Sequence, residues 1–237
     1  MELYWLEQRV NDVPFGDEWL SAYEQSRLAA LRFSKRRSDW RLGRWTAKSA
    51  VAAYLGLPRQ ADALAQIEVR PEGSGAPEIL LPDCRAHVAL SLSHSQGIGL
   101  CIVASAGTPV GCDLESVESR KSAFLTDYFT DSEQELASQT PGPKRDLLLT
   151  LLWSAKESAL KAMRCGLRED TRCLHASPDA LGSNRGEWQR LIVEHAGGGS
   201  FSGWWRESGN LVRTILVDAA EKVTSLHALA GTAQMQL

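Results

Sequence analysis

Two carboxylates, Asp113 and Glu115, are separated by one residue inside an alternating segment, residues 110–115, that is typical of a β-strand. Side chains two apart on a strand point to the same face. The two carboxylates therefore repel each other unless water or a cation lies between them. A hard divalent ion such as Mg²⁺ suits them, because it takes oxygen ligands and commonly binds one or two carboxylates together with substrate phosphates. Taken alone, an exposed strand end explains the pattern more often than a metal site does.

A second pair of charged residues, Glu157 and Lys161, lies one helical turn apart in the segment 144–163. The surrounding residues are good helix formers without Gly or Pro, and the apolar ones recur on one face at helical spacing. Glu157 and Lys161 fall together on the opposite face. A solvated ion pair at this spacing, worth a few tenths of a kcal/mol, is the plain interpretation. One wall of a catalytic site is the alternative.

A cluster of basic residues stands out against the formal net charge of −3, because residues 32–48 carry seven basic side chains and one acid. Arg41, Arg44 and Lys48 are spaced i, i+3 and i+7 and project from one side of a helix. They form either a solvated basic face or a phosphate site built from the guanidinium groups of the arginines.

Further along, Ser93 and His94 end a predicted strand at a turn. Two adjacent residues cannot adopt the geometry of a hydrolytic triad, and no G-x-S-x-G motif accompanies them.

The elements that must position these residues are mostly readable from the apolar pattern. A helix is predicted over 17–31 and a long one from 39 to 55, where Gly56-Leu57-Pro58 ends it. Thr130 and Glu133 form a capping box, which we interpret as structural. The remaining prediction is a set of strands and one loop, namely strands at 3–6, 88–94, 99–104, 110–115, 188–193, 203–206 and 211–217, and a loop over 71–77. The sequence after residue 223 carries no chemistry that we can identify.

Composition bounds the class of protein. The 237 residues, 43% hydrophobic and 23% charged, are enough for one large domain or two of about 100 residues each. The negative net charge argues against bulk binding of nucleic acid, and no apolar stretch approaches the roughly 20 residues of a membrane span. The N-terminus has no signal-peptide pattern. Five cysteines without a C-x-x-C motif favour packed, reduced thiols over a disulfide or zinc framework, and so a cytoplasmic protein.

The order and spacing of these motifs resemble those of one family. The sequence from Arg32 to Leu167 is similar to 4′-phosphopantetheinyl transferases of the larger, pseudo-dimeric type, such as those that activate surfactin synthetase. The resemblance rests on three stretches, with support from Gly43-Arg44 and from residues 129–133: Ser93-His94-Ser95, Gly111-Cys112-Asp113-Leu114-Glu115 and Trp153-Ser154-Ala155-Lys156-Glu157-Ser158-Ala159-Leu160-Lys161. The G-x-D-x-E motif followed about forty residues later by W-x-x-K-E-S-x-x-K is specific to the family.

The resemblance implies an activity and a set of roles. The phosphopantetheine arm of coenzyme A would pass to a serine of an apo carrier protein, with release of 3′,5′-ADP. Mg²⁺ is expected on Asp113, Glu115 and Glu157, and the general base would be Glu157 or, second, Glu115. Lys161 would contact the diphosphate. The residues expected to bind the 3′-phosphate side of coenzyme A are Arg36, Arg44, Lys48, Ser93 and His94.

The resemblance also implies an α+β fold of two similar halves, related by a pseudo-twofold axis, each with a small antiparallel sheet packed on a long helix. We expect the halves to be residues 1–108, on the coenzyme A side, and 109–237, with the metal and catalytic residues, around an active site at their interface. A monomer is expected. Phe124, Leu125, Tyr128 and Phe129 are candidates for carrier contacts, with core packing favoured for at least two. The alternatives are a non-catalytic module that binds coenzyme A or carriers, and a Mg²⁺-dependent nucleotide pyrophosphate hydrolase.

Overall fold

The computed structural model describes residues 1–237 except 83, 180–185, 222, 224 and 232–237. The chain is α+β and divides into two compact units. The first unit consists of residues 1–108 together with 223–237, and the second consists of residues 109–222. The C-terminal residues therefore belong to the first unit and not, as expected, to the C-terminal half. No helix among the described residues has the length and apolar character needed to cross a membrane.

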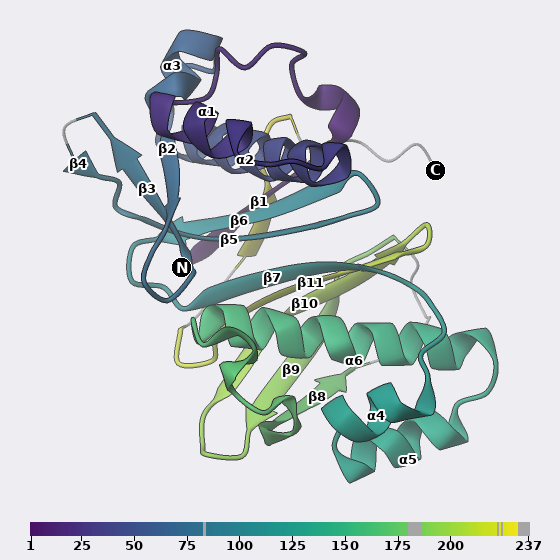
Figure 1. Ribbon diagram of the computed structural model, residues 1–237. Helices are drawn as coiled ribbons and strands as arrows, with labels where there is room; N and C mark the ends of the chain where they lie inside the picture. Colours follow the sequence, from purple (N-terminus) through teal and green to yellow (C-terminus); the bar gives the residue numbers. More distant parts are fainter. Residues whose placement is uncertain (83, 180–185, 222, 224, 232–237) are drawn as a thin grey trace. The chain divides into compact units, whose positions relative to one another are not determined.

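The first unit is built on a sheet of order β12-β1-β6-β5. Its long helix α2 packs on β1, β5 and β6 (Figure 1). The C-terminal strand β12 pairs in parallel with β1, a contact that the sequence did not predict. The elements of this unit are β1 (Glu2–Arg9), the 3₁₀ turn η1 (Val10–Asp12), α1 (Ala22–Ala29), α2 (Ser34–Leu55), α3 (Ala61–Ala65), β2 (Glu68–Pro71), β3 (Pro77–Leu81), β4 (Cys84–Arg85), β5 (Val88–Ser95), β6 (Ile98–Ser105) and β12 (Ser225–Ala228).

The second unit is built on an antiparallel sheet of order β7-β11-β10-β9-β8. Its long helix α6 packs mainly on β7 and β11 (Figure 1). The predicted strand at 110–115 (β7), the predicted helix at 144–163 (α6) and the predicted strands at 188–193, 203–206 and 211–217 (β9, β10 and β11) are confirmed. The strand β8 was not predicted. The elements are β7 (Val110–Ser116), α4 (Ser122–Tyr128), α5 (Asp131–Gln139), α6 (Pro143–Ala162), the 3₁₀ turns η2 (Gly166–Arg168) and η3 (Thr171–Cys173), β8 (Leu174–Pro178), β9 (Gln189–His195), β10 (Ser200–Ser208) and β11 (Leu211–Asp218).

Helix ends follow their local signals. The predicted helix over 17–31 is wrong at both ends, because Ser21 and Glu24 form a capping box that starts α1 at Ala22. The end of α2 is confirmed, since Gly56 adopts a left-handed conformation (φ 67°) that glycine tolerates at a helix C-terminus. The capping box of Thr130 and Glu133 is also confirmed and starts α5.

The two units repeat one topology. In each, a first strand leads through helices to a long helix, and a later hairpin returns so that its second strand pairs antiparallel with the first. These strands are β1, β5 and β6 in the first unit and β7, β10 and β11 in the second. The expectation of a sheet packed on a long helix in each half is confirmed, but only the second sheet is wholly antiparallel, because β12 joins the first sheet in parallel with β1. The pseudo-twofold axis stays a prediction.

The repeat extends to a fully buried ion pair. Lys48 of α2 pairs with Glu24 of α1, and Lys156 of α6 pairs with Glu133 of α5 at 2.7 Å. Both glutamates also accept a backbone hydrogen bond from a strand, from Val69 at 3.1 Å and from Ala176 at 3.0 Å respectively. Both lysines donate in addition to two backbone carbonyls. Each ion pair thus joins three elements of its own unit: the short helix that carries the glutamate (α1 or α5), the long helix (α2 or α6) and a strand (β2 or β8).

Candidate active site

The strand β7 and the helix α6 bring the expected catalytic residues of the second unit together. They approach closely at Gly111, where an added Cβ would lie 1.9 Å from the carbonyl oxygen of Ser158. Ser158 and Ser154 hold the helix to β11, with hydroxyls 2.7 and 2.9 Å from that of Thr214. Gly111 and the two serines of the W-x-x-K-E-S motif therefore have positioning roles. They fix the register that places β7 carboxylates beside polar residues of α6.

Lys161 joins the two elements. Its ammonium donates to Asp113 Oδ1 at 2.8 Å and to the carbonyl of Cys112 at 3.1 Å. Burial by itself would lower the pKa of Lys161, but the attraction of Asp113 and then of Glu157 raises it overall. Lys161 is therefore a fixed positive charge among carboxylates at neutral pH. The plain interpretation, a solvated pair with Glu157, is wrong for this lysine.

Glu115 is the most perturbed carboxyl of the site. Burial first and the charge of Asp113 second raise the pKa of Glu115 to about 7, although Arg120 and a hydrogen bond from Trp153 oppose the shift. Trp153 Nε1 donates to Glu115 Oε1 at 3.2 Å, and Arg120 lies 3.7 Å from Oε2. Glu115 is thus close to half-protonated near neutral pH in the protein without a cation.

Glu157 shares this environment. Burial and then Asp113 raise its pKa, and Lys161 opposes the shift. The charge of Asp113 therefore raises the pKa of both glutamates, and an added cation would relieve this repulsion. The donor chemistry of these carboxylates fits Mg²⁺, which prefers carboxylate oxygens. Among the described residues, however, oxygens of Asp113, Glu115 and Glu157 do not meet within 4.8 Å of one another as a group of three. Lys161 holds Asp113 instead, so the expected metal ligands lie near each other but do not surround one point.

Arg120 and Trp153 were not predicted as functional residues. Both contact Glu115, and the Arg120 guanidinium also lies over the ring of Phe124 at 4.8 Å. Trp153 belongs to the motif that carried the resemblance, but its indole N–H contact with a carboxylate 38 positions earlier has no periodic signal. Only the pairing of α6 with β7 reveals it.

The expected carrier contacts are mostly packing residues. Leu125 and Phe129 are buried in the core of the second unit, as favoured for at least two of the four. Phe124 and Tyr128 are half-buried and stack edge-on against Trp153, with ring centroids 5.1 and 5.0 Å away. These two remain candidates for a partner surface.

In the first unit, two of the expected coenzyme A residues line one pocket of about 440 Å³. Arg36 comes from the first turns of α2 and His94 from the end of β5, and both are exposed. Trp40 also lines this pocket, and the Arg44 guanidinium stacks over the Trp40 ring at 4.8 Å. The remaining lining residues are Phe33, Lys35 and Asp39. Arg44 itself is not among the lining residues, and neither is Ser93, which is half-buried on β5.

The spacing of Arg41, Arg44 and Lys48 does not produce an open basic face. Arg41 donates to the backbone carbonyls of Pro14, Phe15 and Gly16 and so holds the loop before α1. Lys48 is fully buried against Glu24. A phosphate contact of Lys48 does not fit this position, because a ligand would have to break the buried pair to reach it.

Comparison with known proteins finds one family and two curated relatives. Residues 109–208, which hold the β7 and α6 residues, match the sequence model of the family described as the 4′-phosphopantetheinyl transferase superfamily. The chain is 27% identical over 150 residues to the 4′-phosphopantetheinyl transferase HetI of Nostoc sp. strain PCC 7120. That alignment covers 62% of this chain and 61% of HetI. The chain is 40% identical over 78 residues to the holo-[acyl-carrier-protein] synthase of Shouchella clausii, covering 32% of this chain and 66% of that protein.

Residues 109–208 of the chain are thus similar to the 4′-phosphopantetheinyl transferase superfamily. The chain spans less than two thirds of the length of either curated relative. A solved structure of a holo-(acyl-carrier-protein) synthase from Bacillus anthracis, in complex with CoA (3′,5′-ADP), is 24% identical. It matches 43% of this chain and 91% of its own at a TM-score of 0.37. The Helicobacter pylori synthase in complex with coenzyme A is 14% identical, covers 44% of this chain and 99% of its own, and has a TM-score of 0.31.

Proposed function

We propose that this protein transfers the 4′-phosphopantetheine arm of coenzyme A to a serine of an apo carrier protein and releases 3′,5′-ADP. One observation carries the proposal: the carboxylates of β7 and the Glu157–Lys161 face of α6 form one charged site within the residues that match the family. Such a site suits transfer of a phosphoryl-linked group, where positioning and charge stabilisation do most of the catalytic work.

The residues divide the chemistry as follows. The serine hydroxyl oxygen attacks the β-phosphorus of coenzyme A, its proton passes to Glu157, and the bond from that phosphorus to the bridging oxygen breaks. Lys161 stabilises the negative charge that grows on the diphosphate. Mg²⁺, held by Asp113, Glu115 and Glu157, would supply further neutralisation of that charge. Glu115, whose pKa lies at about 7, is the second choice as base.

The test of the transfer is a mass gain on apo carrier proteins incubated with coenzyme A and Mg²⁺. We expect Glu157→Gln to lower kcat by about 10²–10⁴-fold, the usual contribution of a positioned general base. Asp113→Asn should abolish transfer, whereas Glu135→Gln, at an exposed position on α5, should leave it unchanged. Near-normal rates in both site variants would contradict the assignment. Release of nucleotide products without any carrier would favour the hydrolase, and binding without turnover would favour the non-catalytic module.

We propose that the pocket of Arg36 and His94 binds the 3′-phosphate of coenzyme A. A guanidinium and an imidazole converge on an opening lined also by the rings of Phe33 and Trp40. The test compares coenzyme A with dephospho-coenzyme A, which lacks that phosphate. Arg36→Ala should raise KM for coenzyme A by about 10–100-fold, the worth of a charge-assisted hydrogen bond, and should leave KM for the dephospho form unchanged.

The matched control for this pocket is Arg85→Ala, since Arg85 lies on β4 and pairs with Glu72. This variant should keep the preference for coenzyme A. If Arg36→Ala raised KM equally for both substrates, the residue would contact another part of the molecule or act through folding.

A further inference from the structure

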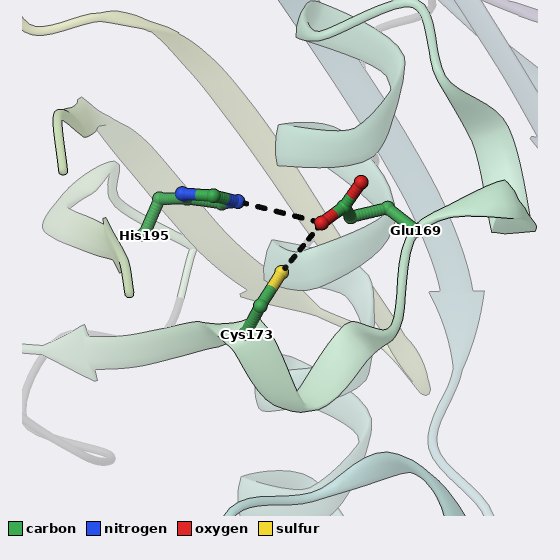
Figure 2. Close-up of side chains that lie close together, drawn as sticks. All are labelled: Glu169, Cys173 and His195. Atoms are coloured by element: carbon green, nitrogen blue, oxygen red, sulfur yellow. Dashed lines mark hydrogen bonds and ion pairs between the residues drawn. The ribbon is translucent and has the colours of Figure 1, made fainter. Parts of the chain in front are cut away.

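Three side chains of metal-binding type converge in the second unit, apart from the carboxylates of β7 and α6. Glu169 follows η2, Cys173 ends η3, and His195 ends β9 (Figure 2). One atom from each, a carboxylate oxygen, the thiol sulfur and an imidazole nitrogen, lies within 4.8 Å of the other two. Glu169 Oε1 stands between its partners, 3.6 Å from Cys173 Sγ and 3.8 Å from His195 Nε2.

These separations fit a tetrahedral zinc site. With Zn–S, Zn–N and Zn–O bonds of about 2.0–2.3 Å, ligand atoms at tetrahedral angles lie roughly 3.4–3.6 Å apart. The two measured separations from Glu169 Oε1 are within a few tenths of an ångström of that range. Small rotations of the side chains would therefore complete three corners of the tetrahedron.

The backbone already holds two of the ligands in place. Cys173 and His195 lie on neighbouring chain segments, because Leu174 is opposite His195 in the β8–β9 register and Ala196 N–H donates to the Cys173 carbonyl at 2.8 Å. The buried Lys156 donates to the carbonyl of Thr171 at 3.0 Å and so anchors η3 to α6. An ion would not have to order this segment, which removes much of the entropic cost of binding.

Of the two ring nitrogens of His195, only Nδ1 makes a hydrogen bond to the described residues. Its Nε2 is buried and has no hydrogen-bond partner among the described residues, while Nδ1 accepts a hydrogen bond from Gly197 N–H at 3.0 Å. In this state Nε2 carries the ring hydrogen. Coordination at Nε2 transfers the hydrogen to Nδ1, so Gly197 N–H must turn away. The glycine turn allows this, since Gly198 and Gly199 both adopt positive φ.

Solvent reaches the cluster through a cavity. Cys173 and His195 line a cavity of about 620 Å³, so a water or another small ligand has access to the fourth corner. We propose that Glu169, Cys173 and His195 bind one Zn²⁺, with the fourth position open to this cavity. The ligand set, one thiolate, one imidazole and one carboxylate, selects zinc over Mg²⁺, because Mg²⁺ prefers oxygen ligands alone.

The test uses the full chain, reduced and stripped of metal with a chelator, and titrated with Zn²⁺ against a chromophoric chelator. One Zn²⁺ per chain is expected. Cys173→Ser, His195→Gln and Glu169→Gln should each weaken binding by at least about 10–100-fold. His175→Gln changes a histidine that lines the same cavity outside the triad, and Cys84→Ser changes an exposed thiol of the first unit. Both controls should bind Zn²⁺ as the unchanged chain does, and excess Mg²⁺ should not displace the ion.

A spectroscopic readout identifies the ligands directly. Co²⁺ in place of Zn²⁺ should give the intense visible bands of tetrahedral coordination and a thiolate-to-metal charge-transfer band that Cys173→Ser removes. Zn²⁺ affinity unaffected by all three triad variants, or a Co²⁺ spectrum without thiolate ligation, would overturn the proposal. Glu169→Gln keeps the test decisive if Cys173→Ser unfolds, because the Glu169 side chain is 42% exposed and its loss should not disturb the core.

Discussion

At the scale of single residues, burial separates side chains that the sequence presents as equivalent. Lys48 and Lys161 each lie on a long helix within a cluster of polar residues. Lys48 is sealed against Glu24, whereas Lys161 is partly exposed and holds Asp113 at the edge of a charged site. Spacing along a helix predicts which residues share a face. It does not predict which neighbouring element covers that face, so the burial of Lys48 could not be predicted from the sequence.

The raised pKa of Glu115 predicts how pH affects stability without a cation. Its folded pKa of about 7 exceeds the ordinary value of 4.5, so the folded state binds the proton more tightly than the unfolded state does. This contribution is fully present below pH 4.5 and is lost as pH rises through 7. Between pH 6 and pH 8 the free energy of unfolding should fall by roughly 1 kcal/mol through this group.

Chemical denaturation of the metal-free protein at several pH values measures this effect. Glu115→Gln, which cannot ionise, should lack that part of the pH dependence. Saturating Mg²⁺ should suppress it as well, since a bound cation favours the carboxylate. A variant with the same pH profile as the unchanged protein would show that Glu115 titrates elsewhere.

At the scale of elements, the most informative feature is the pair of buried Glu–Lys contacts that recurs in both units. The capping boxes at Ser21 and Thr130 signal the helix starts in the sequence, and the glutamate of each box is visible there. The lysine partner lies more than twenty residues away on another helix, so no local pattern connects the two. The long helices and most strands were predictable because their apolar periodicity is strong. The strands β2, β3, β4 and β8 were missed because they are short and half-exposed.

Breaking either pair should destabilise its own unit strongly. Lys156→Met leaves Glu133 buried without its countercharge, which typically costs about 3–5 kcal/mol. The double variant Glu133→Gln with Lys156→Met should recover much of that loss, because no uncompensated charge remains. Thermal or denaturant unfolding of the single and double variants measures the difference, and a double variant no better than the single would argue against the charge explanation.

Variants of the equivalent pair in the first unit, Lys48 and Glu24, distinguish a structural role of Lys48 from a role in binding the 3′-phosphate. Lys48→Met with Glu24→Gln should keep the preference for coenzyme A over its dephospho form once folding is restored. Loss of that preference in a well-folded double variant would return Lys48 to the set of phosphate ligands.

At the scale of the whole molecule, the division of the chain departs from a simple split into two halves. The first unit needs both ends of the sequence, since β12 pairs with β1, and the second unit lies between them. The two ends of the second unit also lie together: the N–H of Asp218 donates to the carbonyl of Pro109 at 3.1 Å. A break in the sequence at Gly107-Thr108-Pro109 indicates where the second unit begins. The short strand β12 gives no comparable signal of where the chain returns.

The second unit should fold when expressed alone as residues 109–222. It has its own core and a five-stranded sheet, and a backbone hydrogen bond joins Asp218 to Pro109 near its two ends. We expect a single cooperative unfolding transition and the same Zn²⁺ binding as in the full chain. The chain ending at residue 222 should, in contrast, lose hydrogen-exchange protection in β1, which loses its parallel neighbour, while β7 and β11 keep theirs. Equal loss of protection in both sheets would contradict this independence.

The adjacency of Pro109 and Asp218 has a consequence for how such chains can be rearranged. When the first and last residues of a segment lie close together, the segment can be replaced by another one. The rest of the chain then has to bridge only the same short distance between the two junctions, whatever segment is inserted. Recombination at these two positions would replace the whole charged site and the glutamate–cysteine–histidine cluster in one event, leaving the strand pairing of β1 and β12 intact. Hybrids that carry the corresponding segment of a homologue between these two positions are thus the chimaeras that we expect to fold.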